Sequence, residues 1–144
     1  LCRDWSSDVC SSDLWTTNVM YTKDTLLRSK EAYEQINILG DDGVPIDYHL
    51  SYWKGEVIDF VISQQDAFDK IDSSSSFARQ KYMVELVVSI CKTTFRFDSF
   101  EEINPFFKRV INQLKQMNYS VFESEQFKNN EKELELLIQE RKVA

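Results

Sequence analysis

Apolar and polar positions along this chain recur with the period of α-helices. From Thr22 to Leu39, large apolar side chains follow one another at intervals of three or four residues, namely Leu26, Leu27, Tyr33, Ile36 and Leu39. This spacing predicts a first helix that buries those side chains and ends at Gly40. A loop follows at Gly40–Pro45, because this short stretch holds two of the three glycines and one of the two prolines.

The next two predicted helices carry broad apolar surfaces. Between Asp47 and Ile71, large apolar side chains fall within an arc of roughly 100° on a helical wheel: Trp53, Val57, Phe60, Val61, Phe68 and Ile71. After a serine-rich break at Asp72–Ser76, the stretch Phe77–Phe95 is apolar on most sides, which predicts a central helix. A buried strand over the β-branched run Leu86–Cys91 is the alternative, and the helical spacing of its flanks favours the helix.

Two further helices follow. Asn104 and Pro105 predict a helix start, with Asn as the N-cap and Pro in the first helical position, and Ser99–Glu102 predicts a capping box before it. The apolar stripe of that helix, which runs to Met117, is Phe106, Phe107, Val110, Ile111, Leu114 and Met117. A charged last helix over Val121–Lys142 places Phe127, Leu134, Leu137, Ile138 and Arg141 on one face. The predicted fold class is therefore all-α, a single-domain bundle of about five helices.

The N-terminal residues have a different origin in our interpretation. Asp4–Leu14 back-translates without a mismatch to a common Illumina sequencing adapter, and Arg3 fits the same reading frame. We therefore exclude residues 1–14 from fold reasoning as an adapter-derived artefact, disordered or meaningless as protein. Residues 15–144 are then a helical domain that we expect to be truncated at its N-terminus. Met20 as the true start and a longer upstream chain are both left open.

Removing residues 1–14 alters the composition. The net charge changes from −7 to −5 because Arg3 and three aspartates drop out, so the chain stays acidic. Cys2 and Cys10 also drop out, which leaves Cys91 alone and removes the basis for a disulfide or a cysteine metal site. A lone cysteine in an apolar run suits the cytoplasm, our default location. Nothing approaches the run of about 18 apolar residues that a membrane span needs.

The residues that carry catalytic chemistry are scarce. His49 is the one histidine, and its aromatic neighbours are typical of a half-buried histidine with a backbone partner. Three glycines do not form a phosphate-binding loop. The cluster of Asp41, Asp42 and Asp47 lacks the spacing of a calcium loop. We therefore expect no catalytic residue, no metal and no cofactor, and we predict that the chain is not an enzyme.

Other side chains have structural interpretations. Cys91 lies on the apolar side of its predicted helix, where a thiol behaves as a small hydrophobic group. The best basic cluster, Lys108 and Arg109 with Lys115, is short and set in an acidic chain. We therefore expect no direct binding of nucleic acid and no membrane contact.

One surface feature points to a partner. On the helical wheel, four carboxylates lie opposite the apolar stripe of the second helix, with an aromatic and an aliphatic side chain beside them: Glu56, Asp59, Asp66, Asp69, Tyr52 and Ile62. A solvated surface is the simpler interpretation. The sharper one is a docking face for a basic protein partner, because clustered negative charge steers association and apolar neighbours anchor it.

The sequence thus favours a small, acidic, helical protein-binding module that acts like an inhibitor or an immunity or antitoxin protein. One alternative is the ligand-binding or dimerisation domain of a truncated transcriptional regulator. Another is a structural subunit of a larger assembly. The expected partner is a basic protein, and homo-oligomerisation is left open.

Overall fold

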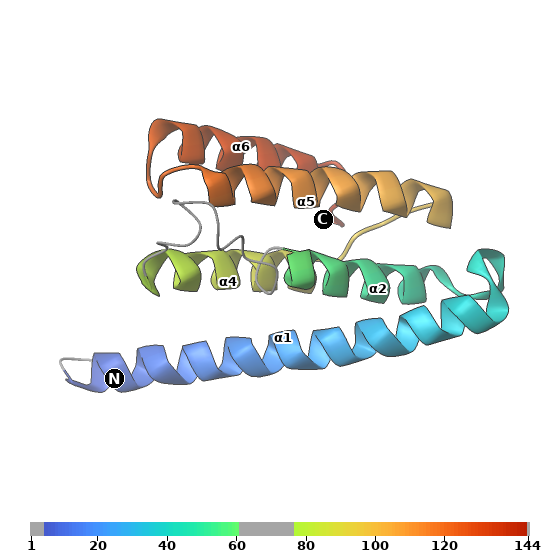
Figure 1. The fold of residues 1–144 in the computed structure, drawn as a ribbon, viewed down its shortest axis with the longest axis horizontal. Coiled ribbons are helices and arrows are strands. Elements are labelled where there is room, and N and C mark those ends of the chain that lie inside the picture. Colours follow the sequence, from blue (N-terminus) through green and yellow to red (C-terminus); the bar gives the residue numbers. More distant parts are fainter. Residues whose placement is uncertain (1–4, 61–76, 144) are drawn as a thin grey trace.

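The computed structural model describes the backbone of residues 5–60 and 77–143, and the side chains of residues 14–60 and 79–143. The α-helices in this part of the chain are α1 (Trp5–Leu39), α2 (Ile46–Ile58), α4 (Phe77–Lys92), α5 (Ile103–Tyr119) and α6 (Glu125–Gln139). Short 3-10 turns, η1 (Asp41–Gly43) and η3 (Phe100–Glu102), precede α2 and α5. The predicted all-α bundle is confirmed. In Figure 1, α1 forms one side, α2 and α4 the middle, and α5 and α6 the other side.

Helix α1 begins earlier than predicted and buries a different face. Neither Gly nor Pro occurs before Gly40, so nothing in the sequence breaks the helix between Trp5 and Leu39. Helical backbone at residues 5–13 has no bearing on whether they derive from an adapter. Leu27, Tyr33 and Leu39 are exposed, so their predicted burial is wrong. The buried positions are instead the small side chains Thr25, Ser29 and Ala32, while Leu26 and Ile36 are half-buried.

A close approach between α1 and α2 explains this choice. Gly55 of α2 lies against Ser29 of α1, so that a Cβ atom added to Gly55 would overlap with the Ser29 side chain. The Ser29 hydroxyl donates a hydrogen bond to the Tyr52 carbonyl oxygen at 2.9 Å. Two backbones that approach this closely leave room only for small side chains between them. The large side chains of α1 are therefore turned outward.

Helix α2 differs in length from the prediction. It ends at Ile58, and a π-helical turn follows at residues 59–60. The predicted continuation to Ile71 lies outside the described residues. Val57 and Ile58 are fully buried, whereas Trp53 and Phe60 are half-buried against the core.

Helix α5 supplies the centre of the core. All six side chains of its predicted stripe are buried, as are the four apolar ones predicted for α6. Phe107 has no exposed surface and contacts the rings of Phe106, Phe95 and Trp53, with centroids 5.3, 5.6 and 6.3 Å away. The first turn was predicted incorrectly: α5 starts at Ile103, directly after η3. Proline is tolerated in the first turn of a helix, so Pro105 does not mark the boundary.

Buried polar contacts join α4 to α5. Arg79 of α4 is buried, and its guanidinium donates hydrogen bonds to the carbonyl oxygens of Met117, at 3.0 Å, and of Asn118. These carbonyls belong to the last turn of α5, where helices leave acceptors unsatisfied and favour positive charge. Arg79 therefore caps the C-terminal end of α5 from the neighbouring helix.

The segment after α6 returns to the connection between α4 and α5. The Arg96 amide donates to the Arg141 carbonyl at 2.9 Å, and the Val143 amide donates to the Thr94 carbonyl at the same distance. The Arg141 guanidinium also pairs with Glu102 at 3.3 Å. Within residues 5–60 and 77–143, no helix is long and apolar enough to cross a bilayer.

Candidate functional site

The structure describes three of the six residues that were predicted to form an acidic docking face on the second helix. Glu56, Asp59 and Tyr52 are half-buried on or just after α2, whereas Ile62, Asp66 and Asp69 lie outside the described part of the chain. The Tyr52 ring stacks on Tyr33 of α1 at 5.5 Å. The docking role of this face stays a prediction.

Burial dominates the electrostatics of this region. Loss of hydration raises the pKa of Glu56 above its usual range, and the neighbouring Asp59 raises it further. The pKa of Tyr52 is raised chiefly by burial, then by Glu56 and Tyr33. The carboxylate of Glu56 thus sits in a partly dry environment and is a weaker docking charge than a fully hydrated carboxylate.

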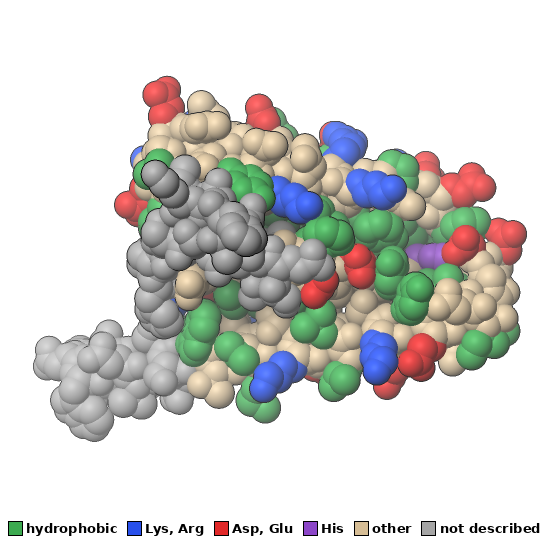
Figure 2. Space-filling model, in the orientation of Figure 1, with side chains coloured by type: hydrophobic (Ala, Val, Ile, Leu, Met, Phe, Trp, Pro, Cys, Tyr) green, Lys and Arg blue, Asp and Glu red, His purple; other side chains and the backbone are tan. Residues whose placement is uncertain are grey.

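His49 has the structural role predicted for it, although it is buried rather than half-buried. Its Nε2 atom lies 3.0 Å from the carbonyl oxygen of Asp41, and its ring stacks on Phe100 at 5.2 Å. Because a carbonyl oxygen only accepts, Nε2 must carry the proton and donate it. The histidine therefore fastens the loop before α2 to the turn before α5; it is the purple side chain in Figure 2.

Cys91 of α4 lies in the core beside α2. Its thiol donates to the Lys54 carbonyl oxygen at 3.7 Å. Burial raises the pKa of Cys91 to about 12, and the nearby Lys54 ammonium opposes that rise without cancelling it. Burial also lowers the pKa of Lys54. A thiol that stays protonated at neutral pH is a poor nucleophile, so this pair offers no catalytic group.

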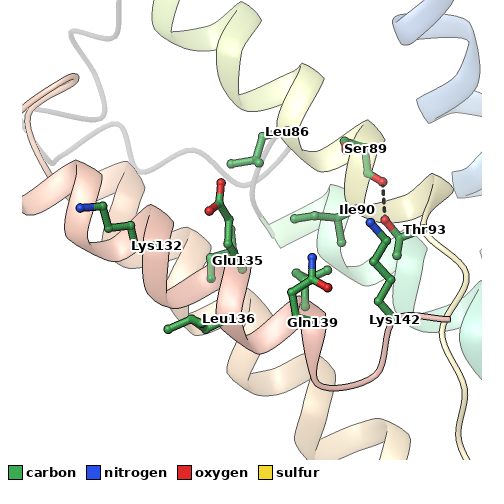
Figure 3. Close-up of a pocket in the computed structure, with 11 residues that line it drawn as sticks. Leu86, Ser89, Ile90, Thr93, Lys132, Glu135, Leu136, Gln139 and Lys142 are labelled. Carbon is green, nitrogen blue, oxygen red and sulfur yellow. Dashed lines mark hydrogen bonds between the residues drawn. The ribbon is translucent and has the colours of Figure 1, made fainter. Parts of the chain in front are cut away.

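A surface groove between α4 and α6 is the more promising feature. Its volume is about 560 Å³, and side chains from both helices line it. Leu86 and Ile90 of α4 face Leu134 and Ile138 of α6 across its apolar floor. Figure 3 shows Leu86 and Ile90 directed from α4 toward α6.

Polar side chains form the rim of this groove. Lys132, Glu135, Gln139 and Lys142 are exposed and follow one another along α6 and the residues after it. In Figure 3, Lys132 and Lys142 lie at opposite ends of the groove, with Glu135 between them. The Thr93 hydroxyl donates to the Ser89 carbonyl at 2.9 Å and so does not point freely into the groove.

A second hollow of about 590 Å³ adjoins the groove and shares three residues with it. Its lining adds Glu85 and Lys92 of α4. Leu136, which is 71% exposed, stands between the groove and a further hollow on the α5 side. The surface around α6 thus combines an apolar floor, an exposed leucine and charged ends.

The sequence held one signal for this groove that our prediction did not use. Leu134, Leu136, Leu137 and Ile138 are four apolar side chains within five residues. A helix with a single buried face accommodates only part of such a run, so one member must face outward. Arg79 gave no comparable signal, because its partners are backbone carbonyls of a distant helix.

Comparison with known proteins connects this chain to a much longer one. It is 31% identical over 123 residues to the V-type ATP synthase alpha chain of Borrelia duttonii, a match that covers 85% of this chain and 21% of that protein. The V-type ATP synthase alpha chain of Protochlamydia amoebophila is 30% identical over 129 residues, and that of Treponema denticola 32% over 113 residues. The chain spans about a fifth of the length of these relatives. No family model matches it.

These relatives correct the function predicted from the sequence. Neither an immunity or antitoxin protein nor a transcriptional regulator is supported, because the similar proteins are ATP synthase chains over most of the length of this chain. The expectation of protein partners agrees with relatives that are named as one chain of a synthase. That name leaves open whether any partner is basic and whether this chain self-associates.

Proposed function

We propose that this chain is a helical segment of a V-type ATP synthase alpha chain, where it supplies contacts between parts of the synthase rather than residues of the nucleotide site. The observation that carries the proposal is identity of 30–32% to three such chains over 78–90% of this chain. Residue identity spread over so much of a helical bundle favours a shared fold and a shared place in the longer protein.

The distribution of glycine supports the second half of the proposal. A phosphate-binding loop needs several glycines close together before a helix and after a strand, followed by Lys and Ser or Thr. The three glycines here are Gly40, Gly43 and Gly55, and none of them precedes such a pair. We therefore propose that the phosphate-binding loop lies in the remaining four-fifths of the relatives' length.

The expected location and the acidic face remain proposals within this function. A cytoplasmic location is compatible with an ATP-forming enzyme. Glu56 and Asp59 are proposed to face a basic surface elsewhere in the synthase. Because both side chains are partly buried, we expect this contact to be small.

A chimera tests the proposal directly. The segment of the Protochlamydia amoebophila alpha chain that matches over 129 residues would be replaced by the corresponding residues of this chain. The chimera would be expressed with the other synthase chains of that organism. We expect it to co-purify with them and to retain ATP synthesis in vesicles.

Two controls define the outcome. An unrelated helical bundle of the same length in the same position should abolish co-purification. The Phe107→Ala variant of the chimera shows how co-purification changes when the hydrophobic core of the segment is weakened. A chimera that is helical and melts cooperatively, yet recovers no other synthase chain, would overturn the proposal.

A further inference from the structure

We propose that the groove between α4 and α6 binds an amphipathic helix of a separate protein chain, one whose apolar stripe carries a carboxylate near each end. Only the source of that helix, another chain of the synthase, rests on the proposed function. The chemistry of the helix follows from the groove itself.

The apolar part of the groove determines the apolar stripe that a bound helix must carry. Leu86 is half-buried, and Ile90 and Ile138 form the floor at 4% and 9% exposure. Leu136 stands at the edge with most of its surface in solvent. An exposed leucine beside an apolar floor, with a polar rim around both, has the composition of a protein interface.

The openness of the site favours a helix over a small molecule. The groove has exposed residues on both banks, Ser89 on α4 and Glu135 and Gln139 on α6, and so does not enclose a ligand. Two roughly aligned helices with apolar side chains between them present a surface on which a third helix can place its own apolar side chains.

The charges along the rim specify the polar residues of the partner. Lys132 lies on α6, and Lys142 lies in the segment after the end of that helix, at the opposite end of the groove (Figure 3). A bound helix with a carboxylate near each end would meet both ammonium groups. The adjoining hollow carries both Lys92 and Glu85, so it adds no net charge to the Lys142 end. Glu135 lies between the lysines, so a basic residue suits the middle of the partner helix.

Peptides of defined charge test the groove without any other synthase component. The first probe is a helical peptide of about five turns, with a leucine stripe, a glutamate near each end and a lysine in the middle. The second has the same stripe with the charges reversed. Fluorescence anisotropy with the full 144-residue chain should show the first peptide binding roughly tenfold more tightly than the second.

Variants identify the binding surface. Leu136→Glu should abolish binding of the first peptide, whereas Leu27→Glu, an exposed leucine on α1, should leave it unchanged. Lys132→Glu combined with Lys142→Glu should reverse the preference between the two peptides. Absence of binding, equal binding of both peptides or insensitivity to Leu136→Glu would overturn the proposal.

The source of the helix is tested separately in the chimera. A photo-crosslinking amino acid in place of Leu136 should join the chimera to another synthase chain. A crosslink only within the chimera would show that the alpha chain covers its own groove and would overturn the assignment to a separate chain. Failure of the unmodified chimera to assemble would instead count against the proposed function, while the peptide result would stand.

Discussion

Helices α1 and α5 are held in the molecule by different kinds of side chain. Helix α5 buries large apolar residues, and Phe107 alone contacts four other aromatic rings that the structure describes. Helix α1 buries Thr25, Ser29 and Ala32 and leaves Leu27 and Ile38 in solvent. Apolar burial stabilises the first arrangement, whereas the second combines close approach of two backbones, the Ser29 hydrogen bond and stacking of Tyr33 on Tyr52. Substitutions on α5 should therefore lower the free energy of unfolding by leaving cavities. Substitutions between α1 and α2 should lower it by steric overlap.

The largest expected effect is at Phe107. Phe107→Ala should lower the free energy of unfolding by about 3–5 kcal/mol, because it leaves a cavity among rigid rings. Urea denaturation followed by circular dichroism measures this change. The matched control is Tyr119→Ala on the same helix, where the ring is 44% exposed and the expected change is below about 1 kcal/mol. Similar losses for both variants would contradict the central place of α5.

A smaller effect is expected where α4 meets α5. Arg79→Met should cost about 2–3 kcal/mol, because it leaves the last carbonyls of α5 without their buried donor. The control Arg28→Met removes an exposed guanidinium that pairs with Asp24 at 3.1 Å, and should cost less than about 1 kcal/mol. If Arg79→Met were as mild as its control, buried charge-assisted bonds would not contribute to this side of the bundle.

Gly55→Ala tests the close approach of α1 and α2. Alanine is the better helix former by about 1 kcal/mol, yet the new methyl group would overlap with Ser29, and overpacking costs about 1–3 kcal/mol. We expect a net loss of about 1 kcal/mol in urea denaturation. Adding Ser29→Gly should recover part of the loss by removing the overlapping atoms. Stabilisation by Gly55→Ala alone would show that the two helices can separate at little cost.

The smallest effect involves pH and Cys91. The pKa of this thiol rises from 9.0 to about 12 in the folded chain, so folding favours the protonated form. Its contribution is complete below pH 9 and is lost as the pH rises toward 12, with about 1 kcal/mol gone at pH 10. Cys91→Ala should flatten this part of the stability profile relative to the parent chain. An unchanged slope between pH 9 and 11 would place the titration on other groups.

Helices α5 and α1 also differ in how far their buried faces can be predicted from the sequence. The stripes of α5 and α6 were predicted correctly because large apolar side chains at helical spacing were also the buried ones. The face of α1 was wrong because the spacing argument follows the large residues, and here Gly55, on another helix, decides which residues fit. Asn104 failed as an N-cap because the turn η3 runs directly into α5.

The candidate groove was beyond a helix-by-helix analysis. Ser89 and Glu135 are far apart in sequence, and only the packing of α4 beside α6 places them on one rim. The polar residues of α2 could be assigned to one face from the sequence. Their partial burial could not be predicted, because it depends on the position of α1.

The small side chains between α1 and α2 have a consequence for the dynamics of the molecule. Separation of α1 would uncover on that helix small side chains and the half-buried Leu26 and Ile36, and no large, fully buried side chain like those of α5, so local opening of α1 should need less free energy than opening of α5. Backbone amides of α1 should then exchange with solvent deuterium earlier than those of α5. The helix with the most outward-facing leucine and isoleucine would be the first part of the bundle to detach, which leaves it able to change neighbours inside a larger assembly while α5 keeps the rest folded.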